Sequence, residues 1–190
     1  MKHTIPSFVL CTLLATACAQ EAPPAFARAK LANASDGSLT TSSQVANGAK
    51  ATVFVFYADA CPCVAHHIER LRALQSKFAP DGVRFFFVDS EVSASIARDR
   101  KLIDERKLPF PILIDDGGIF ARGADAEYAS YTIVVDASGK VRYHGGIDTD
   151  NAHITDDATP FLANALGDLT AGRDVRVKEG KSLGCTLELR

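Results

Sequence analysis

The sequence predicts an α/β fold in which a central mixed β-sheet is flanked by helices. Two observations lead to this prediction. Short apolar runs rich in β-branched and aromatic residues alternate with longer segments in which apolar residues recur at helical spacing. Later in the chain, two strand-like runs are separated only by the turn sequence Ala-Ser-Gly-Lys, which is typical of an antiparallel hairpin. The order βαβα followed by ββα therefore indicates that parallel and antiparallel strands share one sheet.

The first half of the pattern starts with an apolar run at 52–57, which reads as a buried strand. An amphipathic helix follows, with the apolar face Val64, Ile68, Leu71, Leu74 and Phe78. A second buried strand is expected at 83–88, and a second helix is expected at about 92–107. The residues of that helix expected to point inward are Val92, Ile96 and Ile103.

The second half completes the sheet. The elements expected here are a strand at 110–115, a short helical turn at 119–125 and a hairpin made of 131–136 and 141–145. The last helix is predicted to start with Thr159 as its N-cap and Pro160 in the first helical position. Gly172 is expected to end this helix.

The N-terminus has the features of an export signal, assigned to residues 1–19. Its apolar stretch at 8–14 is too short to span a bilayer of roughly 30 Å, and small residues follow it. Cleavage after Ala17 or Ala19 is compatible with this pattern. The same segment also fits a bacterial lipoprotein signal, in which cleavage precedes Cys18 and that cysteine carries lipid. The protein is therefore expected to be periplasmic, or a membrane-anchored lipoprotein facing the oxidising side.

The remaining chain divides into a short leader and one domain. Residues 20–50 contain few large apolar side chains and are expected to form a linker or loosely ordered arm, with an edge hairpin near 38–45. Residues 51–190 are assigned to a single domain with a cysteine-containing tail. The formal net charge of -2 gives no reason to expect a nucleic-acid partner. Membrane contact is expected only through lipid on Cys18.

Cysteine usage points to chemistry at one junction. Cys61 and Cys63 lie where the first predicted strand meets the first predicted helix. Free backbone N–H groups and the positive end of the helix dipole favour a thiolate at such a position. Cys11, and Cys18 if unmodified, would leave with the signal, so Cys185 is the third thiol of the mature chain. Three thiols cannot all pair within one chain, which favours a reactive thiol over a purely structural framework.

Four motifs in order resemble one branch of the redoxin group, within the thioredoxin-like proteins. They are Cys61-Pro62-Cys63-Val64 with His67, Phe110-Pro111-Ile112-Leu113, Tyr143-His144-Gly145-Gly146-Ile147-Asp148 and Gly184-Cys185. The resemblance covers about 51–189. It implies a thioredoxin-like three-layer fold and a thiol redox role without a cofactor. It does not fix the substrate.

The chain departs from related families at three places. Only Pro62 separates the two cysteines, so a disulfide between them would be strained and easily reduced. Ala58 and Phe54 stand where peroxiredoxins carry a hydroxyl residue and a proline, which disfavours a fast peroxidase. Ser130 stands where thioredoxin-like folds usually place a cis-proline, and its peptide bond is predicted to be trans.

Two function classes follow. In the first, an exported thiol–disulfide oxidoreductase or thiol antioxidant uses Cys61 as nucleophile, and Cys63 or Cys185 resolves the intermediate. Its partners would be a disulfide or oxidised-thiol substrate and a thiol reductant or oxidant. The alternative is a copper- or zinc-binding or delivery protein that uses Cys61, Cys63 and His67. That ligand set would require a backbone kink between the cysteines, and His67 fits equally well as a core residue. A module that only binds a partner is a third, weaker reading.

Overall fold

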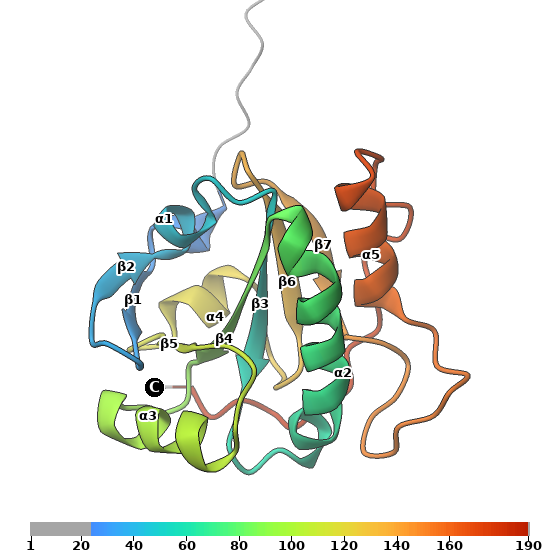
Figure 1. The fold of residues 1–190 in the computed structure, drawn as a ribbon. Coiled ribbons are helices and arrows are strands. Elements are labelled where there is room, and N and C mark those ends of the chain that lie inside the picture. The colour runs from blue at the N-terminus through green and yellow to red at the C-terminus, as the bar shows by residue number, and fades with distance from the viewer. Residues whose placement is uncertain (1–23, 190) are drawn as a thin grey trace, which may run out of the picture.

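The computed structural model describes residues 24–189, which form one seven-stranded mixed sheet with helices on both faces (Figure 1). The strands are β1 (Lys30–Asn33), β2 (Leu39–Thr41), β3 (Ala51–Tyr57), β4 (Val83–Asp89), β5 (Ile112–Ile114), β6 (Thr132–Asp136) and β7 (Val141–Gly145). Their order across the sheet is β2-β1-β5-β4-β3-β6-β7. The predicted α/β class with a mixed sheet is confirmed.

The middle of the sheet is parallel and its flanks are antiparallel. Strands β3, β4 and β5 run parallel, whereas β6 pairs antiparallel with β3 and β1 pairs antiparallel with β5. Every residue of β3 is buried, as expected for a central strand covered on both faces. Because β3 and β4 are parallel and in register, Tyr57 and Asp89 end them side by side. Loops leaving these carboxyl ends therefore meet at one edge of the sheet.

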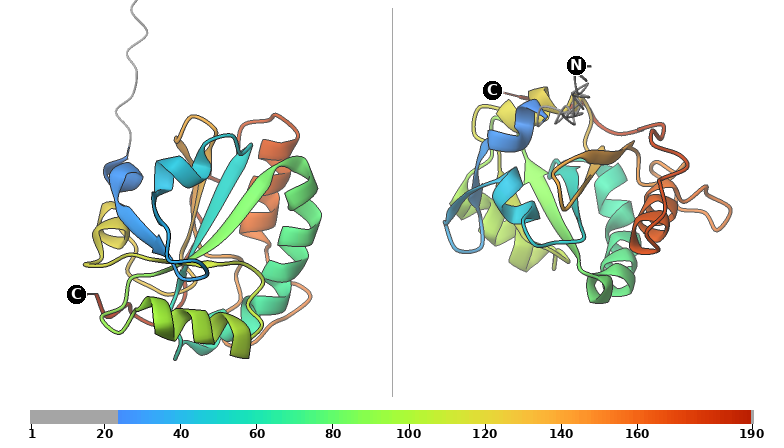
Figure 2. Two further views of the ribbon diagram at one scale, coloured as in Figure 1. Left: turned by 60° about the vertical axis from the view of Figure 1, so that its left-hand side comes forward. Right: turned by 90° about the horizontal axis from the view of Figure 1, so that it is seen from above.

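The helices cover both faces of the sheet. They are the 3-10 turns η1 (Ala25–Arg28) and η2 (Ala79–Asp81), and the helices α1 (Ser42–Ala46), α2 (Pro62–Phe78), α3 (Ile96–Glu105), α4 (Ile119–Gly123) and α5 (Phe161–Thr170). The view from above in Figure 2 shows α2 and α5 together on one side of the sheet, with α4 and η1 on the other. Aromatic rings fill the second interface, where Phe120 lies 5.1 Å from Phe54 and 4.8 Å from Phe26 between ring centroids.

The segment expected to be a loose arm is part of the folded domain. From residue 24 onward it forms η1, β1, β2 and α1, and β1 extends the sheet by pairing with β5. Two of its large apolar residues, Phe26 and Leu31, are buried in the core, whereas Leu39 is exposed. The hairpin predicted at 38–45 exists, but it is formed by β1 and β2 over 30–41.

The signal predicted for 1–19 lies outside the described residues. Within residues 24–189, no helix is long and apolar enough to cross a membrane.

Helix α3 is shorter than predicted. It begins at Ile96 because the hydroxyl of Ser95 caps it by accepting a hydrogen bond from the N–H of Arg98. The preceding residues turn outward to meet the C-terminal tail, and the N–H of Val92 donates to the carbonyl of Glu188 at 2.8 Å. Val92 and Ile96 are consequently 50% and 38% exposed, so the prediction that they point inward was wrong.

The other predicted elements are confirmed to within a few residues, with one small change at α5. That helix starts at Phe161 with Pro160 as its N-cap, rather than with Thr159 as the cap.

Candidate active site

The cysteine pair lies where β3 ends and α2 begins. Cys61 is the N-cap of α2, with an extended backbone (φ -84°, ψ 110°), whereas Cys63 already belongs to the first helical turn. The N–H of Cys61 donates to the carbonyl of Ala58 at 3.1 Å, which closes the short loop after the strand. Cys61 is 2% exposed and Cys63 is 5% exposed. Both thiols are therefore held in fixed, nearly dry positions.

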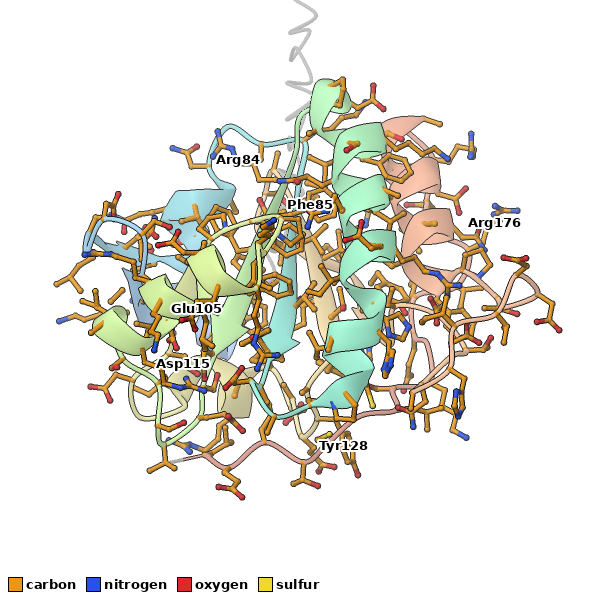
Figure 3. All side chains as sticks on the ribbon, turned by 60° about the horizontal axis from the view of Figure 1, so that its bottom comes forward. Arg84, Phe85, Glu105, Asp115, Tyr128 and Arg176 are labelled. Atoms are coloured by element: carbon orange, nitrogen blue, oxygen red, sulfur yellow. The ribbon has the colours of Figure 1, made fainter. Side chains whose placement is uncertain are left out.

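The C-terminal tail returns to this junction and pairs with residues 127–129. The N–H of Ala129 donates to the carbonyl of Cys185 at 2.8 Å, and the N–H of Leu187 donates to the carbonyl of Glu127 at 2.9 Å. Tyr128, which forms a bridge with Thr186, marks this place in Figure 3. The tail thus behaves as a short added strand that carries Cys185 to the cysteine pair.

A glycine is required next to Cys185. A Cβ atom at Gly184 would lie 1.9 Å from the carbonyl oxygen of Ala129, so no larger residue could follow this path. Ser130 fixes the tail from the other side, because its hydroxyl donates to the carbonyl of Leu183 at 2.9 Å. Residues 24–189 contain no cis peptide bond, which confirms the trans prediction for Ser130. Its φ of 71° is left-handed.

The structure brings together all three predicted thiols. The Sγ atoms of Cys61, Cys63 and Cys185 all lie within 4.8 Å of one another, and none of them is in a disulfide. Cys63 also donates a hydrogen bond from its thiol to the side-chain oxygen of Asn151. The arrangement is a compact cluster of three reduced sulfurs beyond the carboxyl end of β3.

The three thiols have different electrostatic environments. Burial opposes ionisation of Cys61, but hydrogen bonds from the Cys185 thiol and from backbone N–H groups, including that of Val64, lower the pKa of Cys61 overall. Burial and the neighbouring Cys61 charge raise the pKa of Cys63. Burial and the hydrogen bond to Cys61 raise the pKa of Cys185 to about 12. The cluster therefore favours one thiolate, on Cys61, beside two protonated thiols.

His67 is a core residue and does not reach the sulfurs. It is 2% exposed, and its Nδ1 lies 2.7 Å from the carbonyl oxygen of Cys63. Its Nε2 lies 3.0 Å from Oδ1 of Asp148. Both ring nitrogens are thus engaged, so the structure does not support a metal site made of Cys61, Cys63 and His67. Cys185 takes the place next to the two sulfurs.

A buried ionic network links the first turns of α2 to the loop that follows β7. Asp148 accepts hydrogen bonds from His67, from the guanidinium of Arg70 and, at 2.8 Å, from the N–H of Asp150. Burial opposes the charge on His67, but the hydrogen bonds to Asp148 and to the Cys63 carbonyl raise the pKa of His67 overall. These contacts favour the protonated ring and hold its Nδ1 against the Cys63 carbonyl.

Sequence reasoning did not assign roles to Arg70, Asp148 or Asn151. Asp148 ends one of the quoted motifs, which was the only signal for it. Arg70 lies in α2 and reaches Asp148, and Asn151 lies in the loop after Asp148 and reaches Cys63. Only the fold brings these partners together, and no local sequence pattern marks either residue.

A hollow of about 220 Å³ opens beside Cys61 between the β3 loop, α2 and the end of α3. Its lining includes apolar surface from Ile68 and Leu108. At its rim, Arg106 pairs with Asp59 at 2.5 Å. Cys61 is thus buried but forms part of the wall of this hollow.

A family model described as Redoxin matches residues 4–158. The chain belongs to the Redoxin family. Together with the fold, this confirms the redoxin branch of the thioredoxin-fold superfamily, and it supports a thiol oxidoreductase or antioxidant as the function class. No curated protein matches the chain.

Solved structures similar to this redoxin agree with the fold. An uncharacterised conserved protein from Geobacillus kaustophilus is 27% identical, with a TM-score of 0.77 over 90% of this chain and 94% of its own. The bacterioferritin comigratory protein of Xanthomonas campestris, described for alkyl peroxide reduction, is 19% identical, with a TM-score of 0.58 over 80% of this chain and 96% of its own. The peroxidoxin BcpB of Mycobacterium tuberculosis is 19% identical, with a TM-score of 0.58 over 80% and 99%.

Proposed function

We propose that this redoxin is an exported thiol–disulfide oxidoreductase in which Cys61 is the nucleophile and Cys185 resolves the mixed disulfide. The observation that carries the proposal is the cluster itself. Three sulfurs lie within 4.8 Å of one another, at the start of a helix whose N–H groups favour a thiolate on one of them. A nucleophile and two candidate resolving thiols are thus in place before any substrate arrives.

The reaction is a pair of thiol–disulfide exchanges. The Cys61 thiolate attacks one sulfur of a substrate disulfide, forms a mixed disulfide and releases the other substrate sulfur as a thiolate. Cys185 then loses its proton to that thiolate and attacks the Cys61 sulfur. The second substrate sulfur leaves as a thiolate and takes a proton from water. The substrate is reduced to two thiols while the protein is oxidised to a Cys61–Cys185 disulfide, and the reverse sequence oxidises a dithiol.

Cys185 suits the resolving role better than Cys63. The Cys185 thiol is hydrogen-bonded to the Cys61 sulfur, whereas the Cys63 thiol also donates to Asn151. Only Pro62 separates Cys61 from Cys63, so a bond between them would close a small ring at a helix start. Cys185 comes from a distant segment of the chain, so a Cys61–Cys185 bond closes no such small ring.

Two further features bear on the substrate class and on the compartment. Ala58 is buried in the loop before Cys61 and offers no hydroxyl to a peroxide, so a disulfide suits the site better than a hydroperoxide. The signal predicted for residues 1–19 supports export, with or without lipid on Cys18. In an oxidising compartment, a second thiol protein would have to return electrons to the cluster or accept them.

Trapping the mixed disulfide tests the assignment of the resolving thiol. Reduced protein is mixed with glutathione disulfide, quenched with acid, and the glutathione adduct on Cys61 is measured by mass spectrometry. We expect Cys185→Ser to accumulate this adduct at least about tenfold above the wild-type level, because its resolving thiol is gone. The matched variant Cys63→Ser should stay near the wild-type level. Accumulation only in Cys63→Ser would transfer the resolving role to Cys63.

A further inference from the structure

We propose that the fully reduced cluster is also a copper site, which binds one Cu(I) ion between the Sγ atoms of Cys61, Cys63 and Cys185. Three convergent sulfurs form a soft ligand set of the kind that binds Cu(I), zinc and iron–sulfur clusters. They lie within 4.8 Å of one another without a metal present. In a planar three-coordinate site with metal–sulfur bonds of about 2.3 Å, the sulfurs would be about 4.0 Å apart. The cluster therefore needs little rearrangement to close around an ion.

The backbone kink that such a site requires is present. Two residues that are two positions apart in a helix point to nearly opposite sides. Cys61, however, is the N-cap and has an extended backbone, whereas Pro62 and Cys63 are the first two residues of the helix. This change of conformation turns the Cys61 side chain to the side of Cys63. The tail then supplies Cys185 as the third ligand, a place that sequence reasoning had given to His67.

The donor set favours Cu(I) over Zn(II). Among residues 24–189, no histidine nitrogen or carboxylate oxygen joins the three sulfurs in a cluster. Both nitrogens of His67 are occupied by the Cys63 carbonyl and Asp148. Structural zinc is almost always bound by four ligands, whereas Cu(I) is stable with three thiolates.

The surroundings can hold the negative charge of the loaded cluster. One Cu(I) and three thiolates carry a net charge of -2, and binding releases the protons of Cys63 and Cys185. Backbone N–H groups of Cys63, Val64 and Cys185 are hydrogen-bonded to the Cys61 sulfur. Such hydrogen bonds stabilise bound thiolates from the second shell. Because the metal occupies the redox thiols, the loaded protein would be unable to exchange disulfides.

Titration with Cu(I) under anaerobic conditions tests this proposal. The reduced protein competes with a colorimetric Cu(I) chelator, and X-ray absorption at the copper edge identifies the ligand atoms. We expect one Cu(I) per chain with three sulfur neighbours, and protection of all three thiols from alkylation. Cys185→Ser should lower the affinity by more than about 100-fold, because a ligand is worth at least as much as an outer-shell partner. His66→Gln, an exposed change on the same helix, should leave the affinity unchanged.

Absence of stoichiometric Cu(I) binding would overturn the copper site, as would a nitrogen neighbour at copper or unchanged affinity in Cys185→Ser. The same preparation, oxidised in a glutathione buffer, shows whether the redox function stands. A Cys61–Cys185 disulfide that forms in protein unable to bind Cu(I) would reject the metal site alone.

Discussion

Replacement of Cys61 by serine is expected to slow the reaction of the reduced cluster with a small disulfide by at least about 100-fold at pH 7. Serine fills nearly the same space but provides no thiolate. The two remaining thiols have raised pKa values, so they react only weakly at neutral pH. The measurement is the release of the coloured thiol from an aromatic disulfide, followed by stopped flow.

The Cys63→Ser variant is the matched control, since it keeps the nucleophile and should react within a few-fold of the wild-type rate. The pH profile adds a second readout. Because the pKa of Cys61 is lowered, the midpoint of the wild-type rate–pH profile should lie below pH 9.0, and the rate should fall as the pH drops through that pKa. A Cys61→Ser protein that reacts at the wild-type rate would contradict the assignment of the nucleophile.

The Asp148→Ala substitution is expected to lower the free energy of unfolding by about 3–5 kcal/mol. The Asp148 side chain is 1% exposed and pairs with His67 and Arg70, so its removal leaves both groups without the buried carboxylate that they share. Denaturant unfolding followed by circular dichroism measures the change. The exposed residue Asp156 lies in the same loop, and Asp156→Ala should shift stability by less than about 0.5 kcal/mol.

The pH dependence distinguishes this ionic network from simple packing. Burial opposes the charge on Asp148, but hydrogen bonds from His67 and Arg70 lower its pKa, so its contribution is present above pH 3.8 and lost as the pH falls through the folded value. The pKa of His67 is raised, so its contribution is present below pH 6.5 and lost as the pH rises through its folded value. The difference between wild type and Asp148→Ala should therefore be largest between pH 3.8 and 6.5. A difference that is flat with pH, or below about 1 kcal/mol, would contradict the network.

Local patterns were sufficient for most of the sheet and for the identity of the three thiols. The β-branched and aromatic run of β3 and the helical spacing of α2 placed Cys61 and Cys63 at the right junction. Physical causes are visible where prediction failed. The arm looked polar overall, yet Phe26 and Leu31 are buried in the core together with several of its alanines. Such burial depends on contacts with distant parts of the chain, which local composition does not show.

The role of His67 was open for the same reason. Helical spacing placed it at the edge of a buried face, where a ring can either meet a sulfur or be satisfied in the core. The outcome depends on Asp148, a residue 81 positions away. The position of Cys185 likewise depends on hydrogen bonds between the tail and residues 127–130. The glycine before Cys185 was visible in the sequence, but its steric reason appears only once Ala129 lies against it.

The most direct test of the redox cluster is to equilibrate the protein in a series of glutathione redox buffers and map its disulfides by mass spectrometry. We expect a reversible Cys61–Cys185 bond that forms between about -270 and -120 mV, the range of known oxidoreductases. Three thiols that never pair within the chain across this range, or a bond confined to Cys61 and Cys63, would contradict it.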